Sequence, residues 1–287
     1  MMHENCGKQT THTISAEIKS KIREIWNMPE LEECNFIHFQ EILEEDYHIR
    51  ISYTPLYKFL KSNCNEFMES DKLIDQLIDL AIKEDIASGD VTTNSIIPAH
   101  SRAIAEMKMK ADGVVSGLKV IRRVYERFEK DIVWTPLVKD GDRVQKGEII
   151  LRIEASYRCL LLGERLSLNI LQRMSGIATE TAKYVKELAG TRTQLLDTRK
   201  TAPGLRLLDK MAVKDGGGTN HRMGLYDMAM IKDNHIKVAG GIPNAVKAVR
   251  ANLPAGIKIE VETTNLEEVK EALAAKADII MLDNMDN

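Results

Sequence analysis

The chain has 287 residues, of which 44% are hydrophobic and 29% are charged, and its formal net charge is −3. This composition is typical of a soluble globular protein with one or two domains, and the small net charge does not indicate a nucleic-acid or membrane-surface partner. No apolar run is long enough to cross a bilayer, and the first residues lack the basic-then-apolar order of a signal peptide.

The four cysteines, Cys6, Cys34, Cys64 and Cys159, are scattered along the chain without a C-x-x-C pair. This spacing counts against a disulfide framework and against a structural zinc site. Because a reducing compartment fits such cysteines best, we expect a cytoplasmic protein.

Residues 1–70 are predicted to form a small helical extension. Apolar side chains recur at helical spacing between Phe36 and Leu43, and a second helix is predicted to begin near Pro55, after a break at residues 46–50. This helix-turn-helix order resembles DNA-binding segments of transposases over a short stretch. A plain helical hairpin is the alternative, and the absence of a basic stripe counts against DNA contact.

Residues 71–175 are predicted to form a small α+β domain. An apolar stripe from Leu73 to Ala81 predicts a helix that ends near Asp85. Apolar stretches predict strands at residues 103–109, 132–138 and 148–153, with turns at 141–142 and 146–147. Two helices are predicted next, at residues 157–174 and 176–188.

Residues 176–287 are predicted to alternate between strands and helices. Strands are predicted at residues 193–196, 227–231, 257–261 and 278–282. Helices are predicted to begin near Pro203, Ile242 and Leu266. This alternation is typical of parallel βαβ units, whose right-handed crossovers place all the carboxyl ends of the strands at one end of the sheet.

Polar side chains follow each of these predicted strands or lie in the adjoining loops. They are Asp197, Thr198, Arg199, Lys200, His221, Arg222, Lys232, Glu260, Glu262 and Asp283. Singly, each has an ordinary explanation: a basic pair in a solvated loop, a carboxylate that caps a helix, or a histidine that is a satisfied polar residue. Their coincidence at four successive strand ends instead favours an active site, because this is the rim where parallel barrels carry their catalytic residues.

The charges on this rim indicate the ligand. The five cationic or cation-capable groups, Arg199, Lys200, His221, Arg222 and Lys232, favour a polyanion, since guanidinium forks match carboxylate and phosphate. The two acids, Glu262 and Asp283, can hold Mg²⁺, which bridges phosphate oxygens. The N–H groups of the glycines at 216–218 would also approach an anion. A carboxylated substrate and a phosphate-bearing one are therefore expected, while the reaction itself stays open.

Five short motifs resemble those of the quinolinate phosphoribosyltransferase family. They are DTRKT at Asp197–Thr201, GGGTNHR at Gly216–Arg222, IKDNH at Ile231–His235, EVE at Glu260–Glu262 and LDN at Leu282–Asn284. The resemblance runs without a gap from about Asp71 to Asn287. It implies a small α+β sandwich domain followed by an incomplete, open TIM-like α/β barrel, with domains at residues 71–175 and 176–287.

The resemblance also implies the reaction, which is phosphoribosyl transfer from phosphoribosyl pyrophosphate to quinolinate with decarboxylation in NAD biosynthesis. Arg199, His221 and Arg222 would bind the two carboxylates of quinolinate, and Lys200 and Lys232 would lie near the reacting groups and phosphates. Thr198 would also contact the substrate. The catalytic set would be Lys200, Lys232, Glu262 and Asp283. Glu262 and Asp283 would hold Mg²⁺. Arg165 would reach into the partner's site in a homodimer.

Two departures from the family pattern lead to further expectations. Residues 1–70 have no counterpart in the family, and the family pattern continues past Asn284. We therefore expect a C-terminally truncated barrel, an incomplete phosphate site and little or no activity of this chain alone. Two alternatives stay open: the related paralogue associated with molybdenum transport, and an inactive fusion of a transposase-like segment to a truncated enzyme. The cluster of Arg199, Lys200, His221 and Arg222 favours quinolinate over the first.

Overall fold

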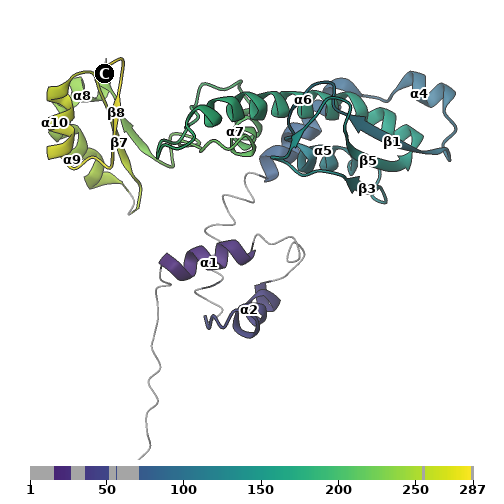
Figure 1. The fold of residues 1–287 in the computed structure, drawn as a ribbon, viewed down its shortest axis with the longest axis horizontal. Coiled ribbons are helices and arrows are strands. Elements are labelled where there is room, and N and C mark those ends of the chain that lie inside the picture. Colours follow the sequence, from purple (N-terminus) through teal and green to yellow (C-terminus); the bar gives the residue numbers. More distant parts are fainter. Residues whose placement is uncertain (1–15, 27–35, 52–55, 57–70, 254–255, 286–287) are drawn as a thin grey trace, which may run out of the picture. The chain divides into compact units, whose positions relative to one another are not determined.

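The computed structural model describes residues 16–26, 36–51, 56, 71–253 and 256–285. The chain divides into two compact units, Met1–Gln76 and Leu77–Asn287. Figure 1 labels the helices and strands of both. None of the described helices is both long enough and apolar enough to cross a lipid bilayer.

The first unit contains helices α1 (Ala16–Trp26) and α2 (Phe36–Glu45). Helix α2 confirms the helix predicted from the apolar spacing, and α1 was not predicted. A cluster of buried side chains joins the helices: Ile22, Ile25, Phe39, Leu43 and Leu56. Leu56 is helical, but the rest of the helix predicted near Pro55 lies outside the described residues. The described part of this unit therefore has a hydrophobic core of its own.

The second unit begins, within the described residues, with a helical stretch that ends at Asp85 as predicted. A short helix α4 (Val91–Ile96) follows, and Asp90 caps it by accepting hydrogen bonds from the N–H groups of Thr92 and Thr93, both at 2.9 Å. Such a cap satisfies N–H groups that lack a partner within the helix.

An antiparallel sheet confirms the three strands predicted in this region. Its order is β1 (Arg102–Lys108), β5 (Ile149–Ser156) and β3 (Val133–Pro136). The predictions missed helix α5 (Leu118–Tyr125) and the two-stranded sheet of β2 (Gly113–Val114) and β4 (Arg143–Val144). Strands of two residues leave no alternation of side chains for a sequence pattern to reveal.

One continuous helix, α6 (Tyr157–Glu187), replaces the two helices predicted at residues 157–174 and 176–188. The prediction of a break was wrong because Gly176 sits inside the helix without interrupting it. A glycine within a helix costs only about 1 kcal/mol relative to alanine. The buried face of α6 continues on both sides of this glycine, through Met174 and Ala178.

The strand predicted at residues 193–196 is reduced to a single parallel bridge between Leu196 and Thr219. Three of its four side chains are exposed, so little apolar burial favours a longer strand there. Helix α7 (Arg206–Asp215) follows and begins three residues later than predicted.

A parallel sheet of order β6-β7-β8 ends the described chain, with strands Ala229–Ile231, Ile259–Thr263 and Ile279–Leu282. Helices α9 (Ile242–Asn252) and α10 (Leu266–Ala274) confirm the predictions. Helix α8 (Asp233–Ala239) occupies residues for which no helix was predicted. The described strands form no closed barrel.

One face of this parallel sheet is covered by helices. Ile231, Ile259 and Val261 are buried in one cluster with Val246 of α9 and Ala272 of α10. Because side chains alternate along a strand, the residues between them project from the opposite face. That second face carries Glu260 and Glu262.

Candidate active site

The register of the sheet places three carboxylates on the face away from the helices. Glu260 pairs with Met230 and Ile279, and Glu262 pairs with Met281, in adjacent parallel strands. Asp283 lies two residues beyond Met281 and therefore projects from the same face as Glu262. Glu260 and Glu262 thus lie on one face of β7, and Glu262 and Asp283 lie near the carboxyl ends of β7 and β8.

Lys232 and Glu262 form an ion pair on this face. The Nζ of Lys232 lies 2.7 Å from Oε2 of Glu262, and Lys232 is the residue just before α8. The next histidine, His235, has a structural role, because its Nδ1 accepts a hydrogen bond of 3.0 Å from the Lys232 N–H. The structure therefore brings two of the predicted catalytic residues into direct contact.

His221 reaches the same face from the loop after α7. Its ring atom Nε2 lies 2.6 Å from Oε2 of Glu260. The Glu260 side chain is only 2% exposed. Glu260 was noted among the polar residues at the strand ends, but it was given no role in the predicted site. Its position two residues before Glu262, on the same strand face, is the signal that could have identified it.

Two guanidinium groups lie close to this histidine. Burial lowers the pKa of Arg222, and the positive charge of Arg199 lowers it further, while Glu260 opposes the shift. Arg222 donates to the carbonyl of Met228 at 3.1 Å and contacts the Met230 sulfur at 3.5 Å. The Nε of Arg199 is buried without a hydrogen-bond partner. The two neighbouring guanidinium groups repel each other, and their hydrogen-bond partners are weak or missing. Both features favour an anionic ligand.

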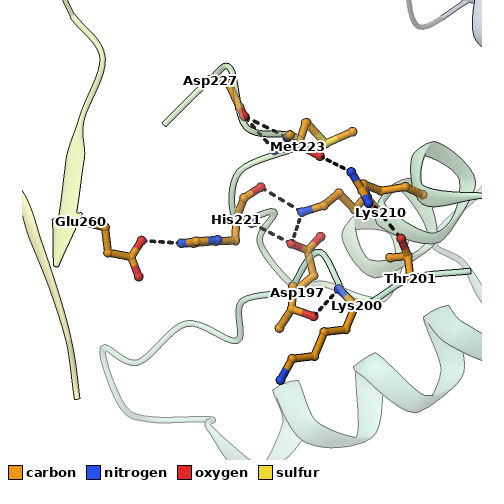
Figure 2. A network of polar contacts seen from close by, with 11 residues as sticks. Asp197, Lys200, Thr201, Lys210, His221, Met223, Asp227 and Glu260 are labelled. Atoms are coloured by element: carbon orange, nitrogen blue, oxygen red, sulfur yellow. Dashed lines mark hydrogen bonds and ion pairs between the residues drawn. The ribbon is translucent and has the colours of Figure 1, made fainter. Parts of the chain in front are cut away.

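A buried network supports the loop that carries His221 (Figure 2). Lys210 of α7 is 1% exposed and forms an ion pair with Asp197. Its ammonium also donates to the backbone carbonyl of His221 at 3.0 Å. Neither Lys210 nor its ion pair was predicted.

The three glycines at 216–218 do not form an anion-binding loop, so that prediction was wrong. Their N–H groups donate to the last carbonyl groups of α7, at 2.9–3.0 Å. They are needed instead for close packing on α6. A Cβ on Gly216 would lie 2.4 Å from the backbone oxygen of Ala178, and one on Gly218 would lie 3.0 Å from the Thr181 methyl. A capped helix end pressed against α6 explains the glycines.

Comparison with known proteins shows the family to which the chain belongs. The model of the quinolinate phosphoribosyl transferase C-terminal domain matches residues 177–287, and that of the N-terminal domain matches residues 90–175. A probable nicotinate-nucleotide pyrophosphorylase [carboxylating] of Synechocystis is 43% identical over 213 residues, which cover 74% of this chain and 72% of the relative. The chain belongs to the quinolinate phosphoribosyltransferase family.

Further relatives support the assignment. A probable nicotinate-nucleotide pyrophosphorylase [carboxylating] of Bacillus subtilis is 45% identical over 201 residues, covering 70% of this chain and 69% of the relative. Among solved structures, NadC from Streptococcus pyogenes superposes with a TM-score of 0.72 at 45% identity, covering 74% of this chain and 75% of the other. The nicotinate-nucleotide pyrophosphorylase from Francisella tularensis gives a TM-score of 0.71 at 41% identity, covering 75% and 76%. These members share the α/β fold of the second unit.

Three other residues assigned by resemblance to the family lie outside the His221 network. Thr198 and Lys200 are exposed, and the Lys200 N–H donates to Thr198 Oγ1 at 3.0 Å. The Lys200 side chain extends away from the His221–Glu260 pair in Figure 2. Arg165 lies on α6, as predicted, and is exposed. Their roles in a quinolinate phosphoribosyltransferase stay predictions.

The described residues gather the predicted family site into two groups. The first contains Arg199, His221 and Arg222. The second contains Lys232 and Glu262. Glu262 also lines a cavity of about 190 Å³ with Asp233, Ile236, Lys237, Thr264 and Glu268. That all the predicted side chains line one cavity stays a prediction.

Proposed function

We propose that this chain transfers the phosphoribosyl group of phosphoribosyl pyrophosphate to quinolinate and decarboxylates the product, giving nicotinate mononucleotide, pyrophosphate and CO₂. The main observation behind this proposal is the pair of neighbouring guanidinium groups, Arg199 and Arg222, beside His221. Relatives named nicotinate-nucleotide pyrophosphorylase [carboxylating] support the same reaction. The molybdenum-associated paralogue is disfavoured because the relatives at 42–46% identity are named for this reaction.

Quinolinate carries two adjacent carboxylates, and the first group of residues matches that charge. The two guanidiniums provide planar forks for carboxylate oxygens, and the orphaned Nε of Arg199 gains a partner when a carboxylate binds. His221 provides a further ring nitrogen. Thr198 and Lys200, which follow the bridge residue Leu196, would complete the quinolinate site from the solvent side.

The second group would bind the ribose and its phosphates. Lys232 provides positive charge toward the pyrophosphate, while Glu262 and Asp283 lie on one face of adjacent strands. Among the described residues, no group of three or more His, Cys, Asp or Glu side chains is placed to hold a metal. Two carboxylates suit Mg²⁺, which commonly binds through one or two of them and completes its shell with water and substrate phosphates. When bound, Mg²⁺ neutralises charge on the leaving pyrophosphate.

The residues of the chain act on this reaction by orientation and electrostatics. Arg199 and Arg222 hold the pyridine ring so that its nitrogen faces the anomeric carbon of the ribose, a proximity effect worth several kcal/mol. As the C–O bond to pyrophosphate breaks, Lys232 stabilises the negative charge and Glu262 the cationic sugar. The new pyridinium then accepts the electron pair of the adjacent C–CO₂ bond. CO₂ leaves and a proton replaces it on the ring.

The three parallel strands are inferred to belong to an open TIM-like barrel, as in the family. We also infer that two chains complete each other's sites as a homodimer, with Arg165 contributed by the partner. Its exposure on α6 is compatible with that role. In a version of the chain extended by the C-terminal segment of a relative, mixing inactive Arg165→Ala and Lys232→Ala variants should restore part of the activity, because mixed dimers contain one site with both residues. No recovery on mixing would reject the shared site.

Turnover is tested by CO₂ release from carboxyl-labelled quinolinate with phosphoribosyl pyrophosphate and Mg²⁺. The 287-residue chain is compared with a version extended by the C-terminal segment of the Synechocystis relative. Release from at least the extended version is expected only when both substrates are present. Failure of both versions to release CO₂ would reject the proposed reaction.

A further inference from the structure

His221 is held by three of its four polar groups. Its backbone N–H donates to Oδ1 of Asp197 at 2.8 Å, and its backbone carbonyl accepts from Lys210 at 3.0 Å. Its Nε2 lies 2.6 Å from Oε2 of Glu260. Within the described residues, Nδ1 has no hydrogen-bond partner. Three charged side chains from three different segments thus fix one residue and leave one of its ring atoms for a ligand.

The charged groups that hold His221 are buried, and this makes their geometry demanding. Lys210 is 1% exposed, and the side chains of Asp197 and Glu260 are 7% and 2% exposed. A buried charge is tolerated only when it is paired and hydrogen-bonded, and such a pair often adds little net stability over an apolar one. The Asn220 amide, with Nδ2 facing the pair, also donates to Asp197 at 2.9 Å. Stability is therefore a weak explanation of this network.

Glu260 determines the orientation of the His221 imidazole. An ionised carboxylate only accepts hydrogen bonds, so Nε2 carries the proton that points to Glu260. A partner at one ring nitrogen fixes the orientation of a histidine, and a ring that carries a proton on each nitrogen can donate from Nδ1 as well. The same carboxylate interacts electrostatically with Arg222. It therefore counterbalances the cations of the site while it aims Nδ1.

We propose that Asp197, Lys210 and Glu260 are positioning residues that aim the Nδ1–H group of His221, in its doubly protonated form, at one of the two carboxylates of quinolinate. The proposal rests on the proposed function, because it assigns a specific atom to the dicarboxylate substrate of that site. The residues act through His221 and do not touch the substrate. Their contribution is specific to the carboxylate that Nδ1 binds.

The test measures the dissociation constants of quinolinate, nicotinate and picolinate for the full chain. Nicotinate and picolinate each lack one of the two carboxylates. Lys210→Met and Glu260→Gln keep the side-chain volume while they remove the charge. Lys214→Met is the matched control, since Lys214 is an exposed lysine one turn further along α7. Should Lys210→Met not fold, the double variant Asp197→Asn/Lys210→Met removes both charges together.

Both charge-removing variants should weaken quinolinate binding about 10-fold or more, which corresponds to the loss of a charge-assisted hydrogen bond. One of the two monocarboxylates should bind the variants and the wild type equally, because it lacks the carboxylate that Nδ1 contacts. Lys214→Met should change none of the three constants. Equal weakening of all three ligands would overturn the proposal, since that is the effect of a merely structural role.

A second readout does not depend on the ligand. The ¹⁵N signals of the His221 ring, assigned by comparison with His221→Gln, should show a protonated, hydrogen-bonded Nε2 in the wild type. Both charge-removing variants should shift these signals. Unchanged signals would overturn the positioning role even if the wild type binds quinolinate. Shifted signals together with no quinolinate binding by the wild type would support the positioning and reject the proposed function instead.

Discussion

Replacing Gly216 with alanine tests whether the glycine loop serves packing or anion binding. Gly216 has a φ of −77°, which alanine adopts without strain. The obstacle is space, because the added Cβ would lie 2.4 Å from the Ala178 backbone oxygen and 2.6 Å from Thr181 Cβ. A backbone oxygen within α6 cannot rotate away, so the loop or the helix must shift.

The expected magnitude combines two opposing effects. Overpacking of this kind costs up to about 3 kcal/mol. Alanine also reduces the conformational freedom of the unfolded chain, which stabilises the protein by up to about 1 kcal/mol. The net loss is therefore about 2 kcal/mol, or a fall in Tm of about 4–8 °C for a unit of this size. Gly176→Ala is the matched control, because its Cβ would meet nothing within 4 Å and should raise the Tm by about 2–4 °C.

The assay follows thermal unfolding by the fluorescence of Trp134 on β3, in a Trp26→Phe background that leaves one tryptophan. Quinolinate affinity is measured for the same variants. Packing predicts a lower Tm for Gly216→Ala, with quinolinate affinity retained wherever the variant is folded. An unchanged Tm combined with lost quinolinate affinity would refute the packing role and restore an anion-binding loop.

Three further predictions concern single side chains. Burial raises the pKa of Asp215 above 3.8. The buried charged form therefore lowers the free energy of unfolding by its full amount above the raised pKa, and this loss disappears as pH falls to about 3.8. Asp215→Asn should therefore raise the urea midpoint more at pH 7 than at pH 4, and the opposite order would contradict this. Asp209→Ala removes two hydrogen bonds to Arg173, at 2.7 and 2.9 Å. It should lower the free energy of unfolding by about 1–3 kcal/mol, since Arg173 can reach water; an unchanged urea midpoint would show the pair to be inert. Because lysine has no planar fork, Arg222→Lys should raise the Kd for quinolinate, measured by calorimetry, about 10-fold. The urea midpoint should stay unchanged.

The sequence predicted those parts of the fold that have a local cause. Apolar stretches and turn glycines located β1, β3 and β5, and helical spacing located α2. The alternation of strands and helices located α9 and α10. Helix α6 was divided in error, because the effect of Gly176 depends on apolar burial on both sides of it. The prediction of a strand before Asp197 was wrong, because a strand needs neighbouring strands and buried side chains. These depend on residues elsewhere in the chain.

The site was predicted where motifs mark it and missed where burial defines it. Lys232 and Glu262 were identified from strand ends and are in contact. Lys210 was missed because a buried lysine and an exposed one look alike in a single sequence. Its partner, Asp197, is 13 residues away, and Glu260 is 39 residues from His221. Such pairings depend on the tertiary fold and leave no periodic pattern.

The measurement that tests the central claim most directly is a calorimetric titration of quinolinate into the full chain and into Arg199→Met. The paired guanidiniums predict one quinolinate bound per chain. Loss of Arg199 should weaken binding about 10-fold or more, because one carboxylate then lacks its charged donor. No binding to the wild type, or equal affinity for both proteins, would contradict a dicarboxylate site formed by Arg199, His221 and Arg222.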